Sequence, residues 1–585
     1  MGCTPCKLSR SPGGKGKAAA TTNNNGGTDL FDAIQEALRS LEADPQADDP
    51  RKRLESVVAG SPNGALAALK KEAGKTGAAK PPPTTAHSLS LSQVDKDPDW
   101  VNCVGEQRCT PLKKLKPQNL SDLVALINEA REAKQRVRAV GSGHAFADVA
   151  RTDGAVLVNP VLLNDVREAD KSQLRPEAQG LTLVHVQAGI TVRAFKEELD
   201  NRGLALINMG GYDGQTLAGT LSTGTHGSGV AYGPLASFAR AIVLVAETGT
   251  VYQIEPAAGV TDPARFPGVL DGVPVTLKQD DEWYRAAQVA MGCLGVVFAY
   301  LYEVTPAFSL REQRTSTTWR EVRALLAPEL WSPVPPAVAA VDHFELVLNP
   351  YNLLFRNACV RVERTRLGGD VAPSGQRKDW LAALLEQASI HSAPDLVALL
   401  NKVPFLSPLV IDQAIMTLVY QGAYIDQSFR VFSLGAANEI KAMALELHCD
   451  ARQTVPVIDR LLDVFQREAL RSLWYMAGPL GVRFVRASDA FLAPQAGRLT
   501  CTIELDMLVG VESGRALAGR VKEALCTDDA ASVRVHWGLD LDFVTAADAR
   551  AWYPDFARWH AVYRELNATG MFNNRFTDRL GISTV

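Results

Sequence analysis

The stretch that decides the fold of this chain is VRAVGSGHAFADVARTDG, residues 137–154. It overlaps the short run RVRAV at 136–140, which is expected to form a strand, and then turns through Gly141 and Gly143 to His144. Closely spaced glycines let the backbone adopt positive φ and bring its N–H groups close to a ligand. Such groups of donors suit a pyrophosphate. Taken alone, the pattern is equally typical of a tight turn between strands.

This glycine turn is not the dinucleotide-binding fingerprint of a doubly wound sheet. Gly141 and Gly143 follow a strand, but Phe146 stands where the third glycine or alanine belongs, and no obvious crossover helix follows. The chain also lacks a G-x-x-x-x-G-K-S/T loop, an H-E-x-x-H pair and a G-x-S-x-G turn. The sequence therefore gives no support to P-loop, zincin or nucleophile-elbow chemistry.

Outward from the turn, short strands and helices alternate without a regular β-α-β order, which predicts an α+β fold. Gly249 separates two apolar runs and predicts a hairpin. A second glycine cluster, TGTHGSG, occupies residues 223–229. The elements expected nearby are a helix at 120–134, strands at 155–158 and 181–187, a helix at 191–202, and strands at 241–246 and 250–254.

Changes in composition divide the chain into four expected parts. They are an N-terminal extension and linker at 1–95, a first domain at 96–310, a second domain at 311–530, and a C-terminal segment at 531–585. The last is rich in aromatic residues, which bury large areas, so we expect it to pack back on the first domain. The second domain should form one wall of a cleft, with strands at 343–350 and 500–508 and helices at 378–389 and 453–470.

The N-terminal extension, residues 1–95, differs in composition from the rest of the chain. Its first 28 or so residues, rich in Gly, Ala, Asn, Lys and Ser, should be disordered. Helices are expected at 29–43 and 62–73, followed by a stiff proline-rich linker at 78–85. Cys3 and Cys6 form a C-x-x-C pair, interpreted as incidental, with a redox or metal-binding pair as the alternative.

Composition bounds the class of protein. A chain of 585 residues is too long for a single hydrophobic core, so more than one domain is expected. Its net charge of −4 gives no reason to expect nucleic acid as a partner. Nine mostly scattered cysteines favour a reducing compartment. The chain has no run of 18 apolar residues and no secretory h-region, so we expect a cytoplasmic protein without a transmembrane segment. The alternative is a protein that associates with a membrane through an acylated N-terminus, at Gly2 or Cys3.

Several ordered segments resemble one family. Residues 137–154 look like the flavin-attachment region of the vanillyl-alcohol-oxidase superfamily, in its aldonolactone and alditol oxidase branch. The resemblance covers about residues 98–585 and implies a two-part PCMH-type FAD-binding domain with a substrate (cap) domain of antiparallel sheet and helices. The further segments that carry it are WVNCVGEQRCTP (100–111), VQAGITV (186–192), residues 207–229, MGCLGVV (291–297), DHFELVLNP (342–350), PLGVRFVRASDAFLAP (479–494), HWG (536–538) and LNATGMFNNRFTDRLG (566–581).

The resemblance implies that FAD is the cofactor and that His144 attaches to a methyl carbon of the flavin ring. It also implies that Gly210 leaves room for O2 beside the flavin, where an alanine would exclude it. No metal is expected. The other residues expected to hold the cofactor are Gly141, Ser142, Gly143, Ala145, Phe146, Thr216, Gly219, Thr223, Gly224, Thr225, His226, Gly227, Gly295, Val296 and Val297.

On the substrate side the resemblance implies that Arg483 is the active-site arginine, whose lasting charge balances that of the reduced flavin. His536 and Glu345 are candidate catalytic residues; Glu446 and Glu504 remain open as further contacts. The chain departs from the family at two positions. Gly481 stands where a glutamate is usual, and Leu539 stands where HWG is usually followed by lysine. A paired loss of opposite charges is physically sensible, because losing one alone leaves a buried charge unpaired.

Three interpretations remain open. The first is an oxidase of an alcohol group in a sugar lactone, an alditol or a less polar alcohol, with O2 as acceptor and hydrogen peroxide as product. The second is a dehydrogenase of the same fold with another acceptor. The third is a flavin-binding scaffold without catalysis that acts as an interaction protein, favoured by Gly481 and Leu539. The sequence does not give the oligomeric state.

Overall fold

The computed structural model describes residues 99–352, 356–368, 371–375, 393–419, 422–433, 442–526 and 532–583. Contacts divide the chain into two compact units, Met1–Lys75 and Thr76–Val585, and all described residues belong to the second. The expectations for residues 1–95 and for a helix at 378–389 lie outside the described residues.

A small parallel sheet carries the glycine turn. Its strand order is β3-β5-β4, and the turn begins directly after the residue that follows β4. Helix α4 begins after Asn119, whose side chain accepts a hydrogen bond from Asp122 N, and buries Leu123 and Ile127. The bounds are Lys113–Leu115 (β3), Leu120–Glu132 (α4), Val137–Ala139 (β4) and Val156–Val158 (β5).

A seven-stranded sheet forms the rest of this part of the chain. The β9–β10 hairpin turns at Gly249, which has φ of +79°, as expected from the sequence. In the order in which they pair, the strands are β11 (Val269–Leu270), β12 (Val273–Gln279), β10 (Val251–Glu255), β9 (Ala239–Val245), β13 (Val296–Glu303), β7 (Leu183–Gln187) and β6 (Val166–Glu168).

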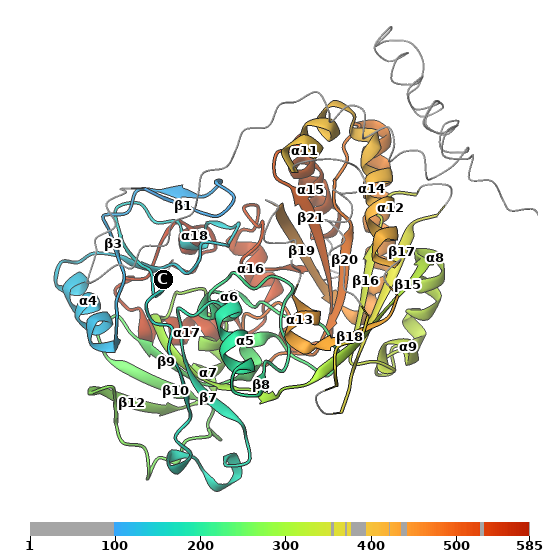
Figure 1. Ribbon diagram of the computed structural model, residues 1–585. Helices are drawn as coiled ribbons and strands as arrows, with labels where there is room; N and C mark the ends of the chain where they lie inside the picture. Colours follow the sequence, from blue (N-terminus) through green and yellow to red (C-terminus); the bar gives the residue numbers. More distant parts are fainter. Residues whose placement is uncertain are drawn as a thin grey trace, which may run out of the picture. The chain divides into compact units, whose positions relative to one another are not determined.

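An eight-stranded sheet follows, and all of its strand pairs are antiparallel. Helices α12 (Ser407–Val419), α14 (Thr454–Arg471) and α15 (Glu512–Leu525) run along one side of it (Figure 1) and contact its strands. In pairing order the strands are β18 (Tyr424–Gln427), β15 (Ser309–Thr318), β17 (Ala358–Arg366), β16 (His343–Leu348), β20 (Leu480–Val485), β21 (Thr500–Leu508), β19 (Ala442–Asp450) and β22 (Arg534–Val535).

The two faces of this sheet differ in chemistry. Side chains alternate along a strand, so Phe344, Leu346, Val482 and Ile503 lie buried on one face. The opposite face carries charged and imidazole side chains, which we call the polar face. Its members are Glu312, His343, Glu345, Arg364, Glu446, His448, Arg483 and Glu504.

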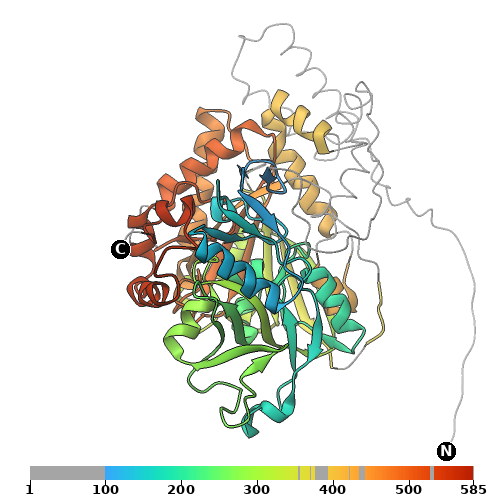
Figure 2. The same ribbon diagram turned by 90° about the vertical axis from the view of Figure 1, so that its left-hand side faces the viewer.

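The C-terminal helices lie beside the strands and helices of the first part of the chain (Figure 2). Helix α17 contacts α7, and Trp559 Nε1 donates to Ala286 O at 3.2 Å. Trp537, Tyr553 and Phe572 are also buried. The remaining helices are α5 (Val192–Asp200), α6 (Leu217–Thr223), α7 (Asp281–Gln288), α8 (Trp319–Leu325), α9 (Pro336–Ala339), α11 (Ala393–Lys402), α13 (Ser428–Phe432), α16 (Ala546–Trp552), α17 (Phe556–Leu566) and α18 (Arg575–Arg579).

The fold is α+β, as the sequence predicts, and each expected element among the described residues is present within two residues of its expected ends. Two short ladders, β1 (Trp100–Val101) with β2 (Arg108–Cys109) and β8 (Leu204–Ala205) with β14 (Thr305–Pro306), complete it. In the described part of the chain, no single helix has the length and hydropathy to cross a membrane. A helix pair bent by 115°, Leu396–Lys402 with Pro404–Met416, meets that test only when taken together.

Candidate active site

The glycine turn is shaped by close contacts that exclude side chains. A Cβ on Gly141 would lie 2.0 Å from Thr216 Oγ1, so only glycine fits there. Gly143 has φ of +69°, a conformation that favours glycine. Phe146 N donates to Gly538 O at 2.8 Å, which ties the turn to the C-terminal segment. The backbone of the turn therefore comes close to its neighbours without intervening side chains.

His144 is held by one partner and is half-buried. Its Nε2 lies 2.7 Å from the hydroxyl of Tyr212, and the two rings are 4.5 Å apart. Its Nδ1 makes no hydrogen bond within the described part of the chain. Burial lowers the pKa of His144, so its imidazole is neutral near pH 7. A neutral imidazole with an available nitrogen is the form that can bond to an electrophilic carbon.

Tyr212 belongs to a segment that is pinned by a buried ion pair. Asp213 Oδ1 accepts from Arg193 at 2.7 Å, and Asp213 also binds Lys196 and Ser433. Burial opposes the charge on Asp213, but its hydrogen bonds to Arg193 and Lys196 lower the pKa of its carboxyl. The loop that presents the Tyr212 hydroxyl to His144 is thus fixed by charge-assisted bonds.

The second glycine cluster packs tightly against residues 207–211. Thr216 caps α6, and Gly224 ends it with φ of +83°. A Cβ on Gly227 would lie 2.2 Å from Asn208 Oδ1. At Gly210 a Cβ would lie 3.3 Å from His226 O, which is a tight contact, although the φ angle of Gly210 is not in the left-handed region.

Gly295 precedes β13 and also requires glycine. Its φ is +155°, and a Cβ would lie 2.6 Å from Val245 O. Val297 is half-buried, whereas the Val296 side chain is 1% exposed and packs in the core. Gly219, Ser142 and Thr225 remain at least partly exposed. Glycine keeps the backbone of these segments free of side chains, so its N–H groups are of the kind that could bind the pyrophosphate of a dinucleotide such as FAD.

The glycine cluster at 223–229 docks on the polar face. Gly229 N donates to Phe484 O at 2.7 Å, and Gly229 forms a parallel bridge with Val485. Ser228 Oγ lies 3.2 Å from His343 Nδ1. These contacts bring the predicted cofactor segment beside β20, the strand that carries Arg483.

Arg483 is surrounded by carboxylates. Its Nη1 donates to Glu504 Oε2 at 2.7 Å, and its Nε lies 4.0 Å from Glu345 Oε1. Burial works against its charge, but Glu504 and Glu345 raise the pKa of Arg483, which remains a cation at every working pH. Glu504 lies directly across from Gly481 in the β20–β21 register. A carboxylate therefore stands beside Arg483 although residue 481 has no side chain.

Glu345 is an anion that accepts hydrogen bonds. It pairs with Arg364, which in turn binds Glu312. Burial opposes its charge, but Arg364 and Arg483 lower the pKa of Glu345 to about 2. A carboxylate with so low a pKa is a weak general base, so its place favours a role in holding Arg483.

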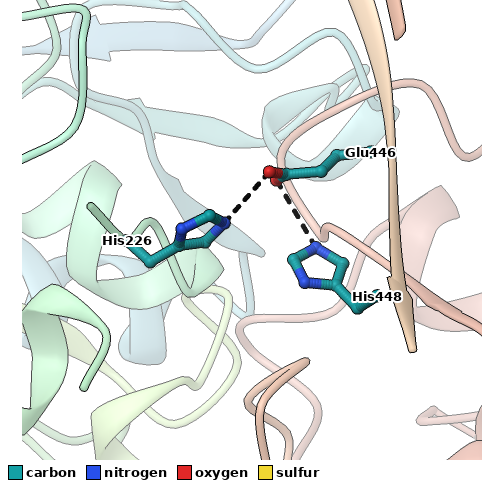
Figure 3. Close-up of side chains that lie close together, drawn as sticks. All are labelled: His226, Glu446 and His448. Atoms are coloured by element: carbon teal, nitrogen blue, oxygen red, sulfur yellow. Dashed lines mark hydrogen bonds and ion pairs between the residues drawn. The ribbon is translucent and has the colours of Figure 1, made fainter. Parts of the chain in front are cut away.

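His536 lies behind this arrangement. It is 6% exposed, its Nδ1 accepts from Gly538 N at 3.0 Å, and its ring stacks 6.2 Å from that of His448. Burial lowers the pKa of His536 to about 3. A catalytic role for His536 stays a prediction, and the geometry gives it no direct contact with Arg483. Glu446 lies between His226 and His448 (Figure 3) and is likewise buried.

Two family models match this chain. A model described as FAD binding domain matches residues 111–255, and one described as D-arabinono-1,4-lactone oxidase matches residues 302–580. The first range holds the glycine turn, and the second holds the whole polar face. The chain belongs to the vanillyl-alcohol-oxidase superfamily. As a member of this superfamily it is an FAD-linked oxidoreductase.

Curated relatives align over almost their full length. L-gulono-1,4-lactone dehydrogenase of Mycobacterium tuberculosis is 28% identical over 483 residues, which is 83% of this chain and 99% of that protein. L-gulonolactone oxidase of Bos taurus is 24% identical over 494 residues, or 82% and 97%. Among solved structures, cholesterol oxidase from B. sterolicum matches with a TM-score of 0.64 at 16% identity, covering 86% of this chain and 100% of that one. This last likeness shows a shared fold.

In this member of the superfamily, sequence reasoning singled out the glycine segments and Arg483 but not the side chains that contact them. Tyr212 and Asp213 lie inside a segment that the sequence had singled out, yet no local spacing signals a contact with His144 68 residues away. Arg364 was missed as well, because a charged residue in a strand is typical of a solvated face.

Proposed function

We propose that this protein is an oxidase that converts an alcohol group of a sugar lactone or alditol to a carbonyl and passes the electrons to O2, forming hydrogen peroxide. The observation that carries the proposal is the docking of the glycine cluster at 223–229 on β20. This contact sets the permanent cation Arg483 beside the glycine segments predicted to hold the flavin. When bound, FAD supplies the acceptor for the substrate's hydride.

Side chains of the polar face hold Arg483 in place. Arg483 is held by Glu504 on one side and Glu345 on the other, so its guanidinium needs no rearrangement during the reaction. Its charge would balance the negative charge that bound FAD gains with the hydride, while the proton of the substrate hydroxyl leaves to water. Because Glu345 is an anion, we assign it to positioning Arg483 and, with Glu504, to accepting hydrogen bonds from substrate hydroxyls.

We further propose that FAD is bound covalently through Nδ1 of His144. This nitrogen carries no competing hydrogen bond within the described chain, and burial keeps the ring neutral. The Tyr212 hydroxyl can accept a proton from Nε2 or donate one to it, so it supports the ring both before and after attachment. A covalent link of this kind keeps the flavin in place.

Oxygen as the acceptor rests on Gly210. The relatives include both a dehydrogenase and an oxidase, so kinship alone does not choose between them. Gly210 lies two residues before Tyr212, which contacts His144, and it lacks the methyl group that would lie 3.3 Å from His226 O. A dehydrogenase with another acceptor is the second candidate. The scaffold interpretation loses the support that it drew from Gly481, because Glu504 keeps a carboxylate beside Arg483.

Substrate bleaching tests the proposal. The purified full chain is mixed anaerobically with L-gulono-1,4-lactone, D-arabinono-1,4-lactone, alditols and, as an apolar comparison, cholesterol, while flavin absorbance is followed. We expect bleaching by a lactone or an alditol and rapid recolouring with peroxide formation when air is admitted. Bleaching without recolouring would identify the dehydrogenase. No bleaching by any of these compounds would contradict the proposal.

A further inference from the structure

Three side chains to which the proposed reaction assigns no step form a fully enclosed cluster. His226 comes from the glycine cluster, and Glu446 and His448 lie on β19 (Figure 3). Their side chains are 3%, 5% and 0% exposed. One ligand atom from each lies within 4.8 Å of the others. Because protein atoms alone enclose His448, an organic cofactor does not reach it.

The hydrogen bonds of His226 require a positive species next to its Nε2. Its Nδ1 lies 2.8 Å from Gly227 O, a carbonyl that can only accept, so Nδ1 carries a hydrogen. In a neutral imidazole Nε2 then bears a lone pair, yet it lies 3.0 Å from Glu446 Oε1, another acceptor. Two acceptors attract each other only through a proton or a metal ion held between them.

A proton satisfies His226 but leaves His448 unsatisfied. Neither ring nitrogen of His448 has a hydrogen-bond partner among the described residues. Its Nε2 lies 3.4 Å from Glu446 Oε2, close enough for an ion pair but without hydrogen-bond geometry. A buried polar group without a partner costs about 1–3 kcal/mol. The arrangement therefore points to a ligand that both imidazoles and the carboxylate share.

The distances suit a tetrahedral metal ion. Zinc binds histidine nitrogen and carboxylate oxygen at about 2.0–2.2 Å, which places neighbouring ligand atoms roughly 3.4 Å apart. Here His226 Nε2 lies 3.0 Å from one oxygen of Glu446, His448 Nε2 lies 3.4 Å from the other, and the three ligand atoms all lie within 4.8 Å of one another. The Nδ1 contact of His226 with a backbone carbonyl is the second interaction that metal-bound histidines usually make.

We propose that His226, Glu446 and His448 bind one zinc ion, through Nε2 of each histidine and the carboxylate of Glu446. Binding displaces the Nε2 proton of His226 to solvent and leaves a site with one net positive charge. The described residues supply three ligands, so a water molecule takes the fourth position. His536 is not a fourth ligand through Nδ1, which accepts from Gly538 N at 3.0 Å. The ion ties the glycine cluster to β19.

Enclosure determines how the ion behaves. Its ligands come from two segments that are 220 residues apart, and none of them is accessible in the folded chain. The ion therefore enters as these segments assemble. We expect it to resist chelators in the native protein and to be released on unfolding.

The test uses the full-length flavoprotein, expressed with zinc in the medium and freed of surface-bound metal by a chelator. We expect about one zinc per chain by elemental analysis, and release to a zinc indicator only in denaturant. His448→Phe keeps an aromatic ring but removes a ligand, and it should lower the zinc content at least tenfold. His536→Asn keeps an acceptor for Gly538 N and should retain the metal. Flavin absorbance and circular dichroism report whether each variant is folded.

A second measurement on the wild-type chain does not depend on folding of a variant. Refolding with Co2+ instead of zinc should produce the absorption of tetrahedral cobalt at wavelengths longer than the flavin bands. Wild-type protein without metal after both expression and refolding would overturn the proposal, leaving a proton between His226 and Glu446 and a water molecule near His448. Metal that persists in His448→Phe, or is lost in His536→Asn, would equally contradict it.

Discussion

His144 and Tyr212 form a pair in which one hydroxyl fixes one imidazole. Tyr212→Phe keeps the ring, 4.5 Å from that of His144, but removes the bond to Nε2. A neutral hydrogen bond contributes about 1 kcal/mol, so we expect covalent flavin attachment to slow roughly fivefold to tenfold. The measurement is flavin fluorescence of the denatured protein band against time after FAD addition. His144→Ala, which removes the attachment atom, should give no fluorescent band, and unchanged kinetics in Tyr212→Phe would dismiss the role of Tyr212.

Gly210 allows a substitution that adds only volume. Its φ is not in the left-handed region, so alanine is compatible with the backbone. The added methyl group would lie 3.3 Å from His226 O and 3.6 Å from Thr225 Cγ2. We expect Gly210→Ala to slow reoxidation by O2 by about tenfold or more, about 1.4 kcal/mol in barrier, with reduction by substrate little changed. Stopped-flow reoxidation separates the two steps, and equal slowing of both would point to general damage instead.

Contacts between residues far apart in the sequence could not be predicted from local patterns. His144 and Gly141 were singled out because the glycine pattern is local and the family resemblance gives it a role. Tyr212 was not, because its partner lies 68 residues away. The packing that makes glycine obligatory at residue 141 is likewise hidden in the sequence, since it depends on Thr216 approaching from α6.

Among the elements, β20 carries the charge on which the proposed chemistry depends. Arg483→Ala removes the guanidinium while leaving the pairing of β20 with β16 and β21 intact. Loss of one preorganised charge donor typically lowers kcat about 100-fold to 1,000-fold. We expect a loss of that size in steady-state oxidation of the responding lactone or alditol. Arg311→Ala, at an exposed position of β15 in the same sheet, is the matched control and should stay within about twofold of wild type.

The pairing of β20 with β21 explains the missing glutamate at residue 481. A Cβ on Gly481 would lie 3.7 Å from Glu504 Cβ, an ordinary contact, so a side chain can be accommodated there. We expect Glu504→Gln to lower kcat/KM about tenfold, because Arg483 loses its 2.7 Å partner. Adding Gly481→Glu to Glu504→Gln should restore much of that loss. Failure of the double variant to recover activity in a folded, yellow protein would show that the carboxylate's position matters beyond its charge.

Sequence patterns predicted only some of the strands. HFELVLNP shows the alternation of one apolar and one polar face, and β16 forms where it was expected. β15, SLREQRTSTT, is almost wholly polar, because its residues line the charged face and the sheet edge. Its existence depends on pairing with β17 and β18, contacts that no local pattern contains. The register that sets Glu504 opposite Gly481 is hidden for the same reason.

At the scale of the whole molecule, the polar face is a plane of charged side chains that are buried or half-buried. Glu312, Arg364, Glu345, Arg483 and Glu504 connect strands β15, β17, β16, β20 and β21 in one continuous network. Such a network stabilises the fold only while its carboxylates are ionised. Removing one charge leaves its partners buried without a counter-charge. The stability of the molecule is therefore tied to pH through this face.

Protonation of Glu345 in acid should lower the free energy of unfolding. Burial opposes its charge, but Arg364 and Arg483 lower its pKa from 4.5 to about 2. A carboxyl whose pKa is depressed by folding contributes stability above the unfolded pKa, and that contribution is lost as pH falls toward the folded pKa. We expect Glu345 to account for roughly 2 kcal/mol of the stability lost between about pH 7 and about pH 3. Urea unfolding should therefore depend less on pH in Glu345→Gln than in wild type, whereas Glu132→Gln, at an exposed position at the end of α4, should follow wild type. Parallel pH curves for wild type and Glu345→Gln would mean that Glu345 is not ionised against Arg364 in the folded protein.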